Sequence, residues 1–108
     1  MIRHCVLCRF RADVDRAARD ALYERLVALC DALPNVISIG TGENVSPEGL
    51  AQGFDEGFVI DFVDAATRDA YLADDTHRAI GTDLVAALDG GRERGLIVFD
   101  LEMPRPDA

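Results

Sequence analysis

Ile2-Arg3-His4-Cys5-Val6-Leu7-Cys8-Arg9-Phe10 is the stretch from which the fold can be argued. Its content of Val, Leu, Cys and Phe predicts a β-strand over 2–10, which ends where Arg11-Ala12-Asp13 breaks the apolar run. Because side chains alternate along a strand, one face carries Ile2, His4, Val6, Cys8 and Phe10, and the other carries Arg3, Cys5, Leu7 and Arg9. Both faces therefore hold apolar groups.

The rest of the chain alternates between helical and extended segments. Helices are predicted over 13–33, over 64–71, and from residue 75 to the turn Asp89-Gly90-Gly91. Further strands are predicted over 36–42, 58–63 and 96–101, with a loop rich in Gly, Pro, Ser and Asn over 43–57. Either Asp13 or Asp15 can cap the first helix, and alternation places Ile37 and Ile39 on one side of the second strand.

This β-α-β-β-α-β order is that of a ferredoxin-like α+β subunit, in which an antiparallel four-stranded sheet has its helices on one side. That architecture leaves one sheet face bare. Whichever face meets the helices, the other includes apolar groups, either Leu7 and Val59 or Val6 and Phe58. Covering four or five such groups in each subunit would contribute on the order of 10 kcal/mol before the costs of association. A second copy of the sheet is the simplest cover, so we expect a homodimer through the sheet face.

Composition narrows the class of protein. The 108 residues, 49% of them apolar, suffice for one domain, predicted over 1–103 with a polar tail at 104–108. A net charge of −9 argues against nucleic acid and anionic membranes as partners, because both attract basic surfaces. The apolar start is interrupted by Arg3, His4 and Arg9, which fits neither a signal peptide nor a membrane span. Three cysteines, an odd number, favour a cytoplasmic protein over a disulfide framework.

Tyr71-Leu72-Ala73-Asp74-Asp75-Thr76-His77 holds the groups best suited to chemistry, a phenol and an imidazole at the junction of two helical segments. His77 shares the inward face with Ile80 and Leu84, and a neutral imidazole can act as a general base. The helix N-terminus favours the neutral ring, whereas Asp74 and Asp75 favour the charged one. The alternative is structural: His77 bonds nearby backbone, and Tyr71 packs half-buried with its hydroxyl at water.

His4 lies in the middle of the first strand beside Val6 and Cys8. It is either a hydrogen-bonded core residue or, if a pocket lies between sheet and helices, a third group beside His77. Cys5 and Cys8 point to opposite faces of their strand, so this pair can neither hold one metal nor form an unstrained disulfide. The acids between 61 and 75 have no fixed spacing, which favours a solvated surface over a cation site. We expect neither metal nor cofactor.

Five segments in register resemble one known family. They are MIRHCVLCRF at 1–10, GENVSPEGL at 42–50, VIDF at 59–62, Tyr71 with His77, and LIVFD at 96–100. In order and spacing they resemble the stress-responsive dimeric A/B barrel domain family over almost the whole chain. The resemblance implies a ferredoxin-like subunit whose sheet pairs with that of a second copy to form a barrel.

One plant branch of that family is a polyketide cyclase, which closes a linear poly-β-keto thioester product into an aromatic ring by aldol chemistry. The resemblance carries over at His4, Tyr71 and His77. It implies that His77 is the general base and that Tyr71 orients or polarises the substrate. Relatives often have His-Pro-x-His where this chain has Asp74-Asp75-Thr76-His77, a change that alters the turn and adds two negative charges beside His77.

Three functions are open on the sequence alone. The first is a homodimer with a small, mostly apolar pocket in each subunit that binds or transforms a small apolar or keto ligand. The second is a cofactor-independent cyclase or lyase for a keto compound, with His77 as base, Tyr71 orienting and His4 assisting. The third is a structural or stress-related dimer, against which an open cavity lined by all three residues would argue.

Overall fold

The computed structural model describes residues 1–105, and its elements follow the expected β-α-β-β-α-β order. The strands are β1 (Ile2–Cys8), β2 (Val36–Glu43), β3 (Glu56–Phe62) and β4 (Leu96–Glu102). The helices are α1 (Arg16–Ala32), α2 (Ala65–Ala73), α3 (Asp75–Ala86) and α4 (Gly91–Gly95). Of the tail predicted over 104–108, residues 106–108 lie outside the described part of the chain.

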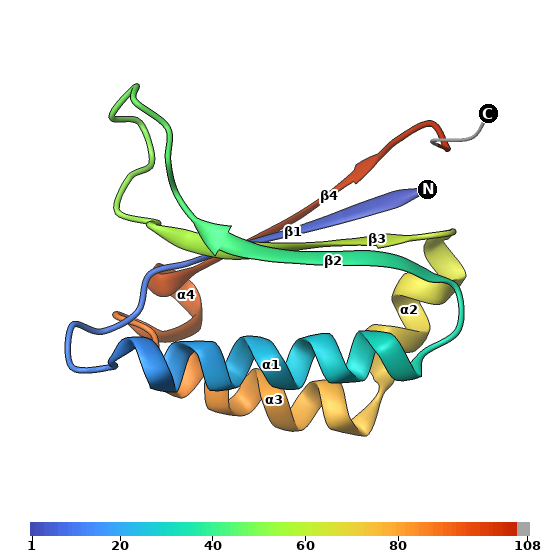
Figure 1. The fold of residues 1–108 in the computed structure, drawn as a ribbon, viewed down its shortest axis with the longest axis horizontal. Helices are drawn as coiled ribbons and strands as arrows, with labels where there is room; N and C mark the ends of the chain where they lie inside the picture. The colour runs from blue at the N-terminus through green and yellow to red at the C-terminus, as the bar shows by residue number, and fades with distance from the viewer. Residues whose placement is uncertain (106–108) are drawn as a thin grey trace.

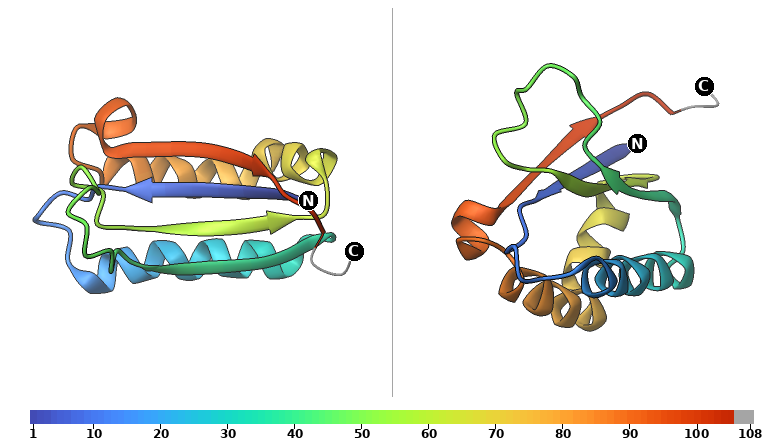
Figure 2. Two further views of the ribbon diagram at one scale, coloured as in Figure 1. Left: turned by 90° about the horizontal axis from the view of Figure 1, so that it is seen from above. Right: turned by 60° about the vertical axis from the view of Figure 1, so that its left-hand side comes forward.

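The four strands form one antiparallel sheet in the order β2-β3-β1-β4. Helices α1 and α3 lie side by side beneath one face of this sheet, and α2 and α4 stand at its two ends (Figure 1). Figure 2 shows the strand order from above, with β4 and β2 at the two edges. The subunit therefore has the ferredoxin-like α+β fold expected from the order of its elements.

Aspartates determine where the three longer helices begin. The carboxylates of Asp15, Asp64 and Asp74 accept hydrogen bonds from backbone N–H groups in the first turns of α1, α2 and α3. Each carboxylate satisfies a donor that the first helical turn leaves unpaired, and each lies at the positive end of a helix dipole. Of the two caps considered for the first helix, Asp15 is the one used.

The core lies between the sheet and the helices. Alternation along β1 and β3 sends Val6, Cys8, Phe58, Ile60 and Phe62 toward helix residues such as Leu26, Ile80 and Leu84. Cys5 precedes Val6 in β1 and therefore points to the sheet face away from the helices, where it pairs in register with Val59 and Phe99. The two cysteines thus lie on different faces of the sheet, as their spacing predicts.

Two local features differ from the sequence prediction. β2 carries a bulge between Val36 and Ser38, so Val36 and Ile39 pack on the core while Ile37 is 43% exposed. A bulge shifts the alternation by one residue, so the predicted pairing of Ile37 with Ile39 is wrong. The helical turn α4 was not predicted: Gly90 and Gly91 both have positive φ, and the chain makes one turn of helix before β4 begins.

The sheet face that points away from the helices, called the outer face here, is partly apolar. Val59, Ile97, Phe99 and Leu101 on this face have exposed fractions between 36% and 46%. The connection between β2 and β3 rises on the same side of the sheet (Figure 1) and carries the exposed side chains Val45 and Leu50. Among residues 1–105, no helix has the length and apolar character needed to span a membrane.

Candidate functional site

A cleft of about 1140 Å³ opens between the strands β1 and β4 and the helices α2 and α3. Its wall is mostly apolar and includes Val6, Phe58, Leu96 and Val98 from the sheet and Leu26, Ile80 and Leu84 from the helices. Its polar lining includes His4, Tyr71, His77, Arg78, Arg92 and Asp100. The three residues singled out in the sequence therefore line the same cavity.

The junction of α2 and α3 holds Tyr71 and His77 together. Asp74 lies between the two helices and caps the start of α3, accepting from the backbone N–H groups of Thr76 and His77 at 2.8 and 3.1 Å. This turn brings the Tyr71 and His77 rings to a centroid separation of 4.3 Å. Within residues 1–105, the buried Tyr71 hydroxyl and the buried His77 Nδ1 have no hydrogen-bond partner.

Burial sets the protonation of both groups. It lowers the pKa of His77, helped by the nearby His4, and outweighs the opposite effects of a hydrogen bond to the Leu72 backbone and of the Asp74 carboxylate. The imidazole is therefore neutral at pH 7, as a general base requires. The contact with the Leu72 backbone is the kind that the structural alternative predicts for His77. Burial also raises the pKa of Tyr71, so its phenol stays protonated and can donate a hydrogen bond. Tyr71 is fully buried, not half-buried with its hydroxyl at water as its structural alternative predicts.

His4 is held from the neighbouring strand. Its Nδ1 lies 2.7 Å from Asp100 Oδ1, and the second oxygen of Asp100 accepts from Arg68 Nη1 at 2.6 Å. Burial would raise the pKa of Asp100, but the hydrogen bonds from Arg68 and His4 prevail and lower it. Because an ionised carboxylate only accepts, Nδ1 of His4 is the donor in this contact. The His4 ring meets the Tyr71 ring edge-on at 5.9 Å.

Sequence reasoning missed four charged residues of this region. Asp100 and Arg68 hold His4, and Arg78 and Arg92 line the cleft. One signal was available for Asp100: in an antiparallel pair of β1 with β4 it falls opposite His4, on the face that meets the helices. The arginines come from three different helices, so only the tertiary structure brings them near the same place.

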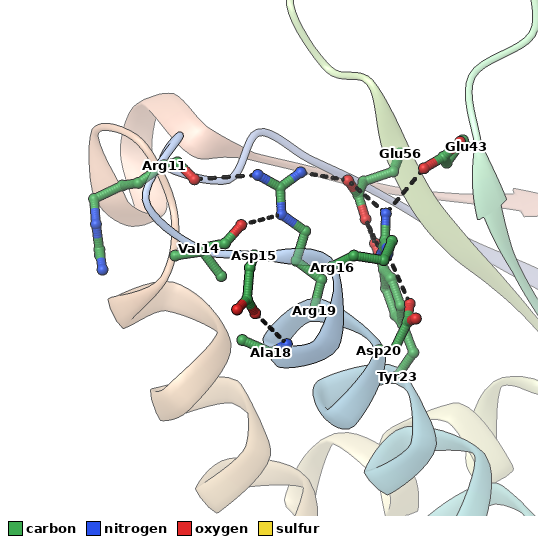
Figure 3. Close-up of polar contacts among 10 residues, drawn as sticks. All are labelled: Arg11, Val14, Asp15, Arg16, Ala18, Arg19, Asp20, Tyr23, Glu43 and Glu56. Atoms are coloured by element: carbon green, nitrogen blue, oxygen red, sulfur yellow. Dashed lines mark hydrogen bonds and ion pairs between the residues drawn. The ribbon is translucent and has the colours of Figure 1, made fainter.

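A second buried polar cluster lies at the other end of the sheet and is fully satisfied (Figure 3). Glu56 accepts from Arg16 at 2.9 Å, Arg19 at 2.8 Å and the Tyr23 hydroxyl at 2.8 Å. Burial would raise the pKa of Glu56, yet these three donors together lower it. Both oxygens of this carboxylate accept hydrogen bonds from protein donors, so we interpret the cluster as a structural link between α1 and β3.

Comparison with known proteins decides the class. The family model described as Stress responsive A/B Barrel Domain matches residues 2–103. The chain belongs to this family. A dimeric ferredoxin-like protein of unknown function from Jannaschia sp. CCS1 is 30% identical to it, with a TM-score of 0.81 over 94% of this chain and 98% of that one.

Two plant proteins share the A/B barrel subunit fold at lower identity. One, from Arabidopsis thaliana, is 22% identical, with a TM-score of 0.85 over 97% of each chain. The other is a hydroxynitrile lyase from Passiflora edulis, 16% identical, with a TM-score of 0.81 over 97% of this chain and 96% of that one. No curated protein matches this chain. These comparisons establish family and fold, and no specific reaction.

Proposed function

We propose that this A/B barrel protein binds a small, apolar carbonyl compound in the cleft of each subunit. Three buried side-chain atoms have no hydrogen-bond partner within residues 1–105, namely Arg9 Nε, Tyr71 Oη and His77 Nδ1. The observation that carries the proposal is that the last two belong to residues lining the cleft. An unpaired buried polar atom costs about 1–3 kcal/mol. A ligand that supplies the missing partners removes this cost, whereas a purely structural role for the dimer explains neither the atoms nor the cleft.

The same arrangement favours a cofactor-independent lyase or cyclase step as a second candidate. His77 would remove a proton from a carbon next to the carbonyl: the C–H bond breaks, an N–H bond forms, and the electron pair moves to the carbonyl oxygen. Tyr71 would donate a hydrogen bond to that oxygen, with His4 assisting. The resulting enolate carbon would then attack a second carbonyl of the same ligand: a ring C–C bond forms, the first C=O bond is restored, and the π bond of the second carbonyl breaks. The alkoxide that results would take back the proton held by the His77 imidazolium. The hydroxynitrile lyase of Passiflora edulis has the same fold, which is in keeping with lyase chemistry here.

Exchange of the α-protons of octan-2-one in D2O, followed by NMR, tests the proton-abstraction step without knowledge of the natural ligand. We expect the protein to accelerate the exchange and His77→Gln to abolish the acceleration. Circular dichroism and light scattering should show that the variant keeps its fold and mass. An unchanged rate in His77→Gln would exclude this residue as the base. Line broadening of octan-2-one without faster exchange would leave binding as the function of the cleft.

Other features support proposals for the oligomeric state and the cellular compartment of the protein. We propose that two copies pair through the outer face, because its apolar side chains Val59, Ile97, Phe99 and Leu101 are otherwise exposed to water. The protein from Jannaschia sp. CCS1 is described as dimeric. The cysteines at 5, 8 and 30 are all free and buried, which favours a reducing compartment such as the cytoplasm.

A further inference from the structure

Most arginines of this chain pair with carboxylates. All 11 basic residues are arginines. Seven of them pair with carboxylates, namely Arg3, Arg9, Arg11, Arg16, Arg19, Arg25 and Arg68. Arg78 and Arg92, the two arginines that line the cleft, make neither an ion pair nor a side-chain hydrogen bond within the described residues 1–105. Both side chains are exposed, and within the same residues Arg94 also lacks an ion pair, so what distinguishes Arg78 and Arg92 is their place at the cavity.

The charge of the cleft is opposite to that of the chain. The sequence has 20 acidic residues, yet Asp100 is the one acid among the described residues that line the cleft. Asp100 is already engaged, with Arg68 at 2.6 Å and His4 at 2.7 Å. Arg78 and Arg92 therefore outnumber the acid among the lining residues, in a chain whose net charge is −9.

We propose that the ligand of the cleft is an apolar carboxylate. Its carboxylate is bound by Arg78, which lies near the start of α3 beside His77, since the planar guanidinium group matches a carboxylate with two parallel hydrogen bonds. Arg92, on α4 at the other end of the cleft, adds a second positive charge to the lining. The hydrocarbon part of the ligand lies on the apolar wall that includes Leu84, Leu96 and Val98. This inference rests on the proposed function of the cleft and adds the head group. Because Arg78 directly follows His77 on α3, an apolar keto acid meets both parts of the site.

Octanoate and octanamide test the head group, because they have the same chain and differ in charge. Calorimetric titration at pH 7 should give a dissociation constant for octanoate about threefold lower than for octanamide, the value for one exposed ion pair. Arg78→Gln should weaken octanoate binding about threefold and leave octanamide binding unchanged. Higher salt should weaken the binding of octanoate alone.

Arg94→Gln is the matched control. Arg94 lies on the same helix as Arg92, is exposed and is not among the residues that line the cleft, so its replacement removes the same charge from outside the site. Equal binding of octanoate and octanamide, or an Arg94→Gln effect as large as that of Arg78→Gln, would overturn the carboxylate assignment and leave the apolar cleft in place. Failure of both compounds to bind, with no NMR shifts at Tyr71 and His77, would overturn the proposed ligand site itself.

Discussion

At the level of single residues, two buried tyrosines differ in their hydroxyl groups: one is bonded within the fold, and the other is proposed to bind a ligand. Tyr23 and Tyr71 have similar exposed fractions, 6% and 0%. The Tyr23 hydroxyl donates to Glu56 at 2.8 Å, whereas the Tyr71 hydroxyl has no partner in the part of the chain that the structure describes. The two rings are thus equivalent in burial and differ at the oxygen atom. Only the first hydroxyl adds to the stability of the fold.

Replacing each tyrosine with phenylalanine should separate these roles. Tyr23→Phe removes a hydrogen bond to a charged acceptor and should lower the free energy of unfolding by about 2 kcal/mol. Tyr71→Phe removes an unpaired hydroxyl and should leave the free energy of unfolding unchanged within about 0.5 kcal/mol, or raise it. Urea denaturation followed by circular dichroism measures both. A loss in Tyr71→Phe as large as that in Tyr23→Phe would show that this hydroxyl is bonded in the folded protein, against its proposed role.

At the level of elements, Glu56 joins three segments that are distant in the sequence. It lies at the start of β3 and binds Arg16 and Arg19 from the first turns of α1, and Arg16 also contacts Glu43 at the end of β2 (Figure 3). The Glu56 side chain is 4% exposed and that of Glu43 is 68% exposed. The two carboxylates therefore share one arginine but differ in environment, so their contributions to stability should differ.

The pH dependence of stability should report on Glu56. Its pKa is lowered in the folded protein from the ordinary 4.5, so the unfolded chain takes up its proton first as the pH falls. The stability that Glu56 contributes is therefore fully present above about pH 4.5 and is lost as the pH falls through the folded pKa. Glu56→Gln should lower the free energy of unfolding by about 2 kcal/mol at pH 7. Urea denaturation at pH 7 and below 4.5 should show this difference narrowing in acid.

Glu43→Gln is the control for this pH experiment. Its carboxylate is exposed, so its loss should change the free energy of unfolding by less than about 0.5 kcal/mol at either pH. If the free energies of unfolding of Glu56→Gln and the parent differed by a constant amount down to pH 3, the charge of Glu56 would make no contribution to stability. If Glu43→Gln and Glu56→Gln lowered the free energy of unfolding equally, the stabilisation would depend on Arg16, which contacts both carboxylates, and not on the burial of Glu56.

Most elements could be predicted because their causes are local. Period-2 patterns predicted β1 and β3, an aspartate cap with an apolar stripe predicted α1, and an apolar stripe alone predicted α3. The bulge in β2 could not be predicted, because no residue between Val36 and Ser38 has a backbone preference that requires it. The turn α4 is only five residues long, too short for any periodicity, and its two glycines indicated an end of helix and not a new start.

Across the whole molecule, the order of elements was enough to predict the topology of the sheet. It was not enough to predict the full cleft, because Arg68, Arg78 and Arg92 come from α2, α3 and α4 and their positions depend on how these helices lie against β4. His4, Tyr71 and His77 could be selected because reactive side chains are rare on inward faces. The antiparallel register of β1 with β4 explains one part of their cavity, because it sets His4 beside Asp100 at the edge of the core.

The whole molecule also allows a test of the proposed dimer. Val59 lies at the centre of the outer face, next to Cys5, and is 36% exposed, whereas Leu72 is 41% exposed on α2 beneath the other face. Light scattering at micromolar concentration should give the parent a mass of twice the 11.7 kDa of one chain. Val59→Glu should give the mass of one chain, because pairing two outer faces would bury a carboxylate from each copy. Leu72→Glu, a change of equal chemistry on the helical side, should keep the mass of the dimer. A parent of one-chain mass, or a dimeric Val59→Glu, would show that the outer face is not the interface.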